Sequence, residues 1–261
     1  MTAEGGGEIS FSNAEIEYYR PRVDDIRLDD EKEKVEQGSV RELPLFPLGI
    51  VLNPGANTPL HIFEMRYRLL FNRIQEKDNT FGLIFYNKEN NLVARVGCAA
   101  LVTQYNPLDD GRLLVDNNGT KRFRVLRYLE EKPYIKAMVE FYDDEEPTED
   151  ISEVELNVWS KLQDVLRLSN KLYDKRQEFG ERMTKIAPGD AEQDVEQADR
   201  RKKFSFSVNQ MLDMTVLDQQ LLLQTRSTSM RLKKQDSILD GARQYLAAQV
   251  TIKEALGKDK K

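Results

Sequence analysis

The residues that could carry out chemistry are few in this chain. It contains one histidine, His61, and one cysteine, Cys98. A zinc-hydrolase motif needs two histidines, and a disulfide or a cysteine-based zinc site needs more than one cysteine, so these sites are excluded. His61 lies where a short strand meets a helix, which favours a hydrogen-bonded structural histidine over a functional one. Cys98 has no basic neighbour in sequence to lower the pKa of its thiol, which favours a small buried residue.

Two charged runs could bind ions or charged partners. The acidic run Asp143–Glu146 lacks the alternating ligand spacing of a calcium loop, so a solvated turn is favoured over a cation site. The basic run Arg200–Lys203 follows Asp199, which favours a charged helix start over a site for phosphate or an acidic partner. The Met and Leu positions from Met211 to Leu223 are interpreted as packing rather than as a recognition groove.

The sequence motifs that usually carry catalysis are absent. There is no G-x-x-x-x-G-K-[ST] loop, no G-x-G-x-x-G between a strand and a helix, and no G-x-S-x-G elbow. Counting residues does not exclude a Ser–Lys pair, so a hydrolase of that kind stays open as a third hypothesis. The sequence otherwise predicts no catalytic residue, no cofactor and no metal ligand, and it leaves the protein-binding residues unassigned.

The length, composition and net charge of the chain limit the kinds of protein it can be. A chain of 261 residues, 39% hydrophobic and 32% charged, fits one large domain or two small ones. A net charge of −6 argues against nucleic acid as a partner, and no apolar run approaches the ~18 residues that span a membrane. The first residues resemble neither a secretory signal nor a transit peptide. We expect a soluble protein of the cytoplasm, with the plastid stroma as the alternative.

The pattern along the first half predicts a β-rich region after a polar extension. Residues 1–40 are acidic and poor in apolar residues, so we expect them to be disordered or ordered by a partner, with a short helix at 29–36. Pro44 and Pro47 interrupt the next apolar run, which predicts edge strands or short pieces broken by turns because proline donates no ladder hydrogen bond. A strand at 58–62 and a helix at 63–77 follow, the helix with an apolar stripe that begins at Phe63.

Short strands with tight turns continue to residue 141. Strands are predicted at 81–86, 93–105 and 133–141, with hairpin turns at Asp109–Gly111 and Asn117–Gly119. This arrangement is typical of a small sandwich or barrel-like sheet.

The second half has helical periodicity. Helices are predicted at 151–172, 203–213, 218–226 and 227–256, with a polar loop at 179–199. The inward positions predicted for the last helix are Met230, Ile238, Tyr245, Leu246 and Val250. The predicted division is therefore an extension at 1–40, a β-rich subdomain at 41–147, a helical subdomain at 148–256 and a frayed tail at 257–261.

Specific motifs give this chain a family resemblance. The segments that carry it are Glu42–Gly55, Pro59–Arg68, Phe81-Gly82, Val96–Cys98, Gly119–Val125 and Pro133-Tyr134. Together they resemble the amino-terminal domain of Lon proteases, across about residues 41–256, with Met65 where that family often has proline. The resemblance implies an α+β fold: a pseudo-barrel of antiparallel strands with one helix, followed by a helical bundle with a long terminal helix. Glu131–Tyr134 and Leu246–Gln249 also have near counterparts in stand-alone Lon-domain proteins of cyanobacteria and plastids.

Two functions follow from this resemblance. In Lon, this domain precedes an ATPase and a Ser–Lys peptidase and helps to hold unfolded substrates, which implies a non-catalytic adaptor or chaperone-like factor in protein quality control or proteolysis. Its partners would be other polypeptides, bound as extended chains by strand addition. The alternative is a structural or assembly subunit that binds one fixed folded partner through its helices and its N-terminal arm. The oligomeric state stays open.

Overall fold

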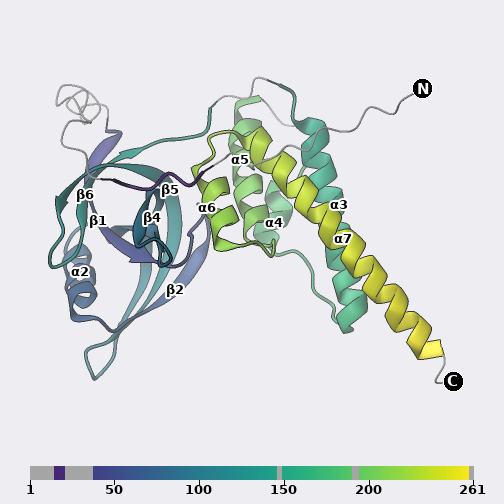
Figure 1. Ribbon diagram of the computed structural model, residues 1–261, viewed down its shortest axis with the longest axis horizontal. Coiled ribbons are helices and arrows are strands. Elements are labelled where there is room, and N and C mark those ends of the chain that lie inside the picture. Colours follow the sequence, from purple (N-terminus) through teal and green to yellow (C-terminus); the bar gives the residue numbers. More distant parts are fainter. Residues whose placement is uncertain (1–14, 21–37, 146–148, 190–193, 259–261) are drawn as a thin grey trace. The chain divides into compact units, whose positions relative to one another are not determined.

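The computed structural model describes residues 15–20, 38–145, 149–189 and 194–258 (Figure 1). The helix predicted at 29–36 lies outside these residues, as does most of the predicted N-terminal extension. The described residues belong to two compact units, considered separately below. The β unit comprises Glu15–Asp143 and Met214–Arg226, and the helical unit comprises Asp144–Asp213 and the chain from Ser227 onward. Both units are therefore discontinuous, whereas the division predicted from the sequence has one boundary near residue 147.

Six strands make up the sheet of the β unit: β1 (Val40–Leu48), β2 (Asn57–Ile62), β3 (Thr80–Asn87), β4 (Leu92–Pro107), β5 (Leu113–Glu130) and β6 (Lys136–Phe141). Their order is β2-β5-β4-β3-β1-β6, and β6 also pairs with β5. The pairing of β5 with β6 closes β5, β4, β3, β1 and β6 into a barrel. Strand β2 is outside this ring and pairs with the first part of β5. All pairings are antiparallel except that of β1 with β3, which is parallel. The predicted α+β class with a barrel-like sheet is confirmed.

The proline-containing strand β1 lies inside the sheet, so the prediction of edge strands there is wrong. Its residues Val40–Pro44 pair with β6, whereas Leu45–Leu48 pair with β3. Each half of β1 thus has its own ladder partner. The strand changes partner between Pro44 and Leu45, and it can therefore contain prolines without being an edge strand.

The hairpin turn predicted at Asn117–Gly119 is also wrong, because β5 runs straight through these residues. Asn117 is buried, and its side-chain amide donates to the carbonyls of Thr58 and Val115. A Cβ atom on Gly119 would lie 2.2 Å from the carbonyl oxygen of Asn53. Glycine is therefore needed at position 119 because two backbone segments lie too close for a Cβ atom, and not because the chain turns there. At Asp109–Gly111, by contrast, the chain does turn, and Gly111 has a φ of +79°.

Helix α2 (Met65–Gln75) packs its apolar face on the sheet. Its buried residues Tyr67, Leu70, Phe71 and Ile74 join a cluster that includes Phe46 and Phe81. The rings of Phe71 and Phe81 meet edge to face, with centroids 4.9 Å apart. Phe63, expected at the start of this apolar stripe, precedes the helix instead and is 62% exposed. One further helix of the β unit, α6 (Val216–Gln224), packs Val216 on the cluster around Phe123.

The helical unit contains α3 (Ser152–Tyr173), α4 (Glu181–Ile186), α5 (Asp194–Asn209) and α7 (Thr228–Lys258). Helices α3 and α7 run side by side in the same direction, since Lys161 pairs with Asp236 and Lys171 with Glu254 (Figure 1). The polar loop predicted at 179–199 is wrong in part, because it contains α4 and the start of α5. Met230 and Tyr245, predicted to point inward, are 46% and 63% exposed.

Buried charges organise the interior of the helical unit. Arg231 of α7 is fully buried and forms an ion pair with Asp144, while its Nε donates to the hydroxyl of Ser205 on α5 at 3.0 Å. Glu155 of α3 is 2% exposed and accepts hydrogen bonds from Arg200 and Arg201. These pairs connect α3, α5 and α7 to one another and to the segment before α3. Of the helices that the structure describes, none is both long and apolar enough to cross a membrane.

Candidate polypeptide-binding surface

The residues with chemical potential in the sequence do not come together in the structure. Cys98 lies in β4 and is fully buried, and burial raises the pKa of its thiol to about 12. The thiol is therefore protonated at neutral pH, which confirms the prediction of a small buried residue. His61 lies on β2 and is exposed, with its ring centroid 6.1 Å from that of Phe63. The prediction of a hydrogen-bonded structural histidine is thus wrong.

Asp144 of the acidic run and the basic run Arg200–Lys203 are held by partners in the helical unit. The prediction of a solvated turn is wrong for Asp144, whose carboxylate holds the buried Arg231 and accepts from the hydroxyl of Thr228 at 2.5 Å. In the basic run, Arg200 and Arg201 bind Glu155, and the lysines that follow pair with Asp199. The basic run lies inside α5, which begins at Asp194, so it is a charged helix segment with structural partners and not the helix start that was predicted. Within the part of the chain that the structure describes, no group of acidic, histidine or cysteine side chains could hold a metal ion.

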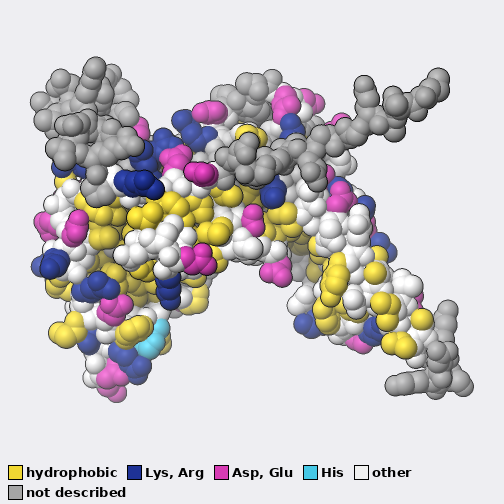
Figure 2. Space-filling view, in the orientation of Figure 1, with side chains coloured by type: hydrophobic (Ala, Val, Ile, Leu, Met, Phe, Trp, Pro, Cys, Tyr) yellow, Lys and Arg dark blue, Asp and Glu magenta, His cyan; other side chains and the backbone are white. Residues whose placement is uncertain are grey.

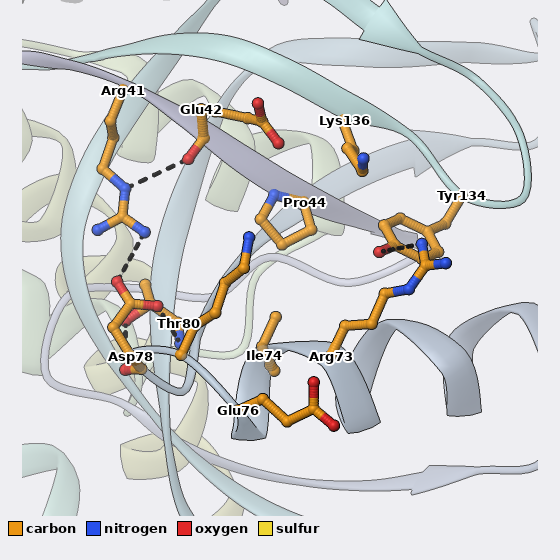
Figure 3. Close-up of a pocket in the computed structure, with 11 residues that line it drawn as sticks. Arg41, Glu42, Pro44, Arg73, Ile74, Glu76, Asp78, Thr80, Tyr134 and Lys136 are labelled. Atoms are coloured by element: carbon orange, nitrogen blue, oxygen red, sulfur yellow. Dashed lines mark hydrogen bonds and ion pairs between the residues drawn. The ribbon is translucent and has the colours of Figure 1, made fainter.

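A polar cleft opens in the β unit between β1, the end of α2 and the start of β6 (Figure 3). Its volume is about 710 Å³. Arg41 forms an ion pair with Asp78 at 2.7 Å, and Arg73 donates to the hydroxyl of Tyr134 at 3.2 Å. Lys136 pairs with Glu130 at 3.0 Å. These three cations of the cleft therefore each have a partner within the protein.

The electrostatics of the cleft match this internal pairing. Partial burial raises the pKa of Asp78, but the hydrogen bond and the charge of Arg41 outweigh it and hold that pKa below its usual value. The hydrogen bond to Glu130 raises the pKa of Lys136. The side chains lining the cleft include no histidine, cysteine or serine. The cleft offers hydrogen-bonding and charged groups to a ligand.

Four large apolar side chains on or beside β2, α2 and β5 are exposed. We call Phe63, Met65, Leu69 and Leu114 the apolar patch; their exposed fractions are 62%, 79%, 37% and 43%. His61 connects the first and last of these, because it is the register partner of Leu114 and its ring lies near Phe63. Met65 and Leu69 lie one turn apart on α2. Figure 2 shows the single histidine, in cyan, beside both hydrophobic and charged side chains.

The apolar patch borders a groove and an open sheet edge. Pro59, Leu60, His61 and Leu114 line a groove of about 340 Å³ with Asn106 and Asp116. In the strand order, β2 stands at one end of the described sheet and pairs with β5 alone. A surface with exposed apolar side chains beside an open strand edge suits the binding of an extended polypeptide.

The apolar patch was not predicted from the sequence. Phe63 was assigned to the buried stripe of the helix, since its spacing to Tyr67 and Leu70 fits that face. The sequence held one signal, namely that Met65 replaces the proline often found in the resembling family. A methionine at a helix start, followed by Arg66, has no apolar partner in the predicted stripe and is therefore a candidate for exposure.

The barrel with its packed helix, followed by a helical unit with a long last helix, defines a class of α+β domains. The chain belongs to the family of the ATP-dependent protease La (LON) substrate-binding domain, whose model matches residues 42–241. This match confirms the resemblance drawn from the sequence motifs.

Related proteins and solved structures agree with this assignment. The chain is 26% identical over 188 residues to a Lon protease of Chlamydia pneumoniae, covering 65% of this chain and 23% of that protein. It is similar in fold to a Lon N-terminal domain protein from Xanthomonas campestris, with a TM-score of 0.51, 23% identity, and coverage of 74% of this chain and 96% of the other. The N-terminal domain of a Mycobacterium avium complex Lon protease gives a TM-score of 0.53 at 14% identity, covering 77% and 98%. The chain thus spans about a quarter of the curated relative and nearly all of these two structures.

Proposed function

We propose that this chain is a non-catalytic recognition module that binds non-native polypeptides through the apolar patch. The observation that carries the proposal is the exposure of Phe63, Met65, Leu69 and Leu114 on β2, α2 and the neighbouring β5 of the β unit. Exposed large apolar side chains can serve as interaction sites, and fully burying one stabilises a complex by about 1.5–3 kcal/mol. The family model that matches this chain describes a substrate-binding domain, which supports the same role.

The geometry favours clients in an extended conformation. A client strand alongside β2 would form backbone hydrogen bonds with its open edge, which depend little on sequence. Alternate client side chains would then face the groove beside His61 and Leu114. Affinity from backbone bonds together with selectivity for apolar side chains is the combination that a receptor for unfolded segments needs. In this proposal, the chain acts as an adaptor or chaperone-like factor in proteolysis or protein quality control.

Fluorescence anisotropy with labelled, permanently unfolded proteins tests this function. Reduced and carboxymethylated proteins of different sequence should bind the folded chain saturably, with dissociation constants of about 1–100 µM because only a few side chains are buried. The same proteins in their native, disulfide-bonded form should bind at least about tenfold more weakly. Equal binding of the unfolded and native forms would contradict the proposal. So would the absence of binding when a cooperative unfolding transition shows that this chain is folded.

The second candidate function is that of a structural or assembly subunit with one fixed folded partner. It is favoured by exposed apolar residues on α3 and α7, where Tyr173, Tyr245, Ile252 and Leu256 are each more than half exposed. A helical face of this kind can pack on a folded surface. In a pull-down from native extract, one stoichiometric partner would support this candidate, whereas many weakly bound clients would support the first.

A further inference from the structure

Residues 15–20 lie as an extended segment against β4 (darkest purple in Figure 1). The backbone N–H of Tyr19 donates to the carbonyl of Val93 at 2.8 Å, and that of Arg95 donates to the carbonyl of Glu17 at 2.6 Å. Tyr18 and Ala94 form an antiparallel bridge. The segment therefore adds a short strand to β4 by main-chain hydrogen bonds.

The register of the sheet explains why β4 can receive this segment. The pairing of β4 with β5 begins at Val96, which is opposite Arg124. Val93 pairs with Tyr86 of β3 on its other side, so the β5 side of residues 93–95 has no partner from the barrel strands. An open strand edge binds any chain that can supply the matching donors and acceptors.

A glutamine on α6 holds the segment from its other side. The side-chain amide of Gln224 donates to the carbonyl of Glu15 at 2.9 Å and accepts from the N–H of Glu17 at 3.2 Å. Gln224 thus satisfies the backbone of alternate residues, as a neighbouring strand would. Between β4 and Gln224, the backbone of Glu17 is satisfied on both sides. The groove between them is built to bind an extended backbone.

Side chains add selectivity to this groove. The ring of Tyr19 stacks on that of Tyr128 with centroids 4.1 Å apart, and its hydroxyl accepts from the N–H of Tyr128 at 3.1 Å. The hydroxyl of Tyr18 accepts from the amide of Asn87 at 2.7 Å. Arg124 lies 3.5 Å from the carboxylate of Glu17. The groove therefore fits the pattern apolar, acidic, aromatic, aromatic, as in Ile16–Tyr19.

We propose that this groove is a receptor for an extended segment of a client polypeptide, and that residues 15–20 are its intramolecular competitor. The client segment would carry an acidic residue followed by aromatic residues. The inference extends the proposed function, polypeptide binding, with a second site separate from the apolar patch. All six docked residues are at least partly exposed, so another chain can replace them without opening the barrel core. Because the segment is tethered, its effective concentration is on the order of millimolar, and it must be displaced before a client binds.

The test uses the full chain and a fluorescein-labelled peptide with the sequence of residues 15–20. The substitution Tyr19→Pro removes the N–H that donates to Val93 and the stacked ring, and so releases the tethered segment. For a peptide affinity of about 100 µM, release from millimolar competition should tighten peptide binding about tenfold relative to the unsubstituted chain. In the Tyr19→Pro chain, adding Gln224→Ala should abolish this gain, because it removes the amide that holds the backbone.

Two further arms keep the inference falsifiable. A peptide that itself carries proline in place of Tyr19 serves as the matched control and should bind neither chain. The thermal transition shows whether Tyr19→Pro disturbs folding. If it does, Glu17→Lys replaces it, because this substitution weakens docking only through the contact with Arg124. Glu17→Lys should raise peptide binding by a smaller factor than Tyr19→Pro. Equal peptide binding to the released and unsubstituted chains, or no binding to a folded released chain, would overturn the inference. Binding of carboxymethylated protein to the apolar patch is measured separately and does not depend on the groove.

Discussion

The β unit and the helical unit build their interiors from different interactions. The β unit packs aromatic and aliphatic side chains around glycines, and rings such as those of Phe71 and Phe123 are fully buried. The helical unit instead buries the ion pairs of Arg231 and Glu155, with Gln235 and Ser205 between the helices. Steric fit therefore sets strand register in the first unit, whereas charge pairing sets how the helices align in the second.

One fluorescent and one chemical probe separate the two units experimentally. Trp159, the single tryptophan of the chain, lies in α3 and packs on Phe179 and Phe204, so its emission reports on the helical unit. Cys98 reports on the β unit, because its buried thiol reacts only after unfolding. Since its pKa is raised to about 12, little thiolate forms at pH 8, and native-state labelling is slow for that reason too.

The largest effect is expected from Arg231→Met in the helical unit. The substitution leaves Asp144 without its buried cation, and breaking such a pair costs about 3–5 kcal/mol. The urea midpoint followed by Trp159 should fall accordingly, while labelling of Cys98 should change little. The matched control is Arg243→Met, whose side chain is 41% exposed and should cost at most about 1 kcal/mol. Equal losses in both variants would show that the buried pair does not organise the unit.

The next effect is expected from Gly119→Ala in the β unit. The new methyl group would lie 2.2 Å from the backbone oxygen of Asn53, which cannot move aside as a flexible side chain can. Overpacking of this kind costs about 1–3 kcal/mol. Labelling of Cys98 in urea should therefore begin at lower denaturant, with the Trp159 transition unchanged. If this variant is as stable as the unsubstituted chain, steric fit at β5 is not what sets the register.

Gly241→Ala should have a smaller effect of opposite sign. Gly241 lies inside α7, and a Cβ atom there would meet nothing within 4 Å. Alanine is favoured over glycine in a helix by about 0.5–1 kcal/mol, so the Trp159 midpoint should rise by a corresponding amount. A fall in the midpoint would contradict the open space that the structure shows at this position.

The smallest effect concerns the ion pair of Arg41 and Asp78 in the polar cleft. Both side chains are more than a third exposed, so Arg41→Gln should cost only about 0.2–1 kcal/mol at pH 7. The pKa of Asp78 is lowered in the folded protein, so its contribution is present above the unfolded value of about 3.9 and lost as pH falls through the folded value. The stability difference between the variant and the unsubstituted chain should therefore shrink as the pH falls below the unfolded value and vanish once it is below the lowered folded value. A difference that persists there would assign the effect to packing.

The sequence predicted the fold class because alternation and helical period are local signals. The long β4, the helices α3 and α7, and the turn at Asp109–Gly111 all have such signals. Partner choice is not local, so the sequence misplaced β1, whose halves pair with β6 and β3, and did not show that α6 packs with the β unit. The apolar patch was missed for a related reason, since the spacing of Phe63 fits a buried stripe whether or not the helix has begun.

The direct test of polypeptide binding compares two matched double variants. Phe63→Ser/Met65→Ser removes half of the apolar patch, and Tyr245→Ser/Ile252→Ser removes two apolar side chains of α7 that are also more than half exposed. Affinity for a carboxymethylated protein is measured by anisotropy for both. The account predicts a loss of at least tenfold for the first variant, equivalent to about 1.4 kcal/mol, and less than twofold for the second. The reverse order would contradict it and place the binding surface on the helical unit.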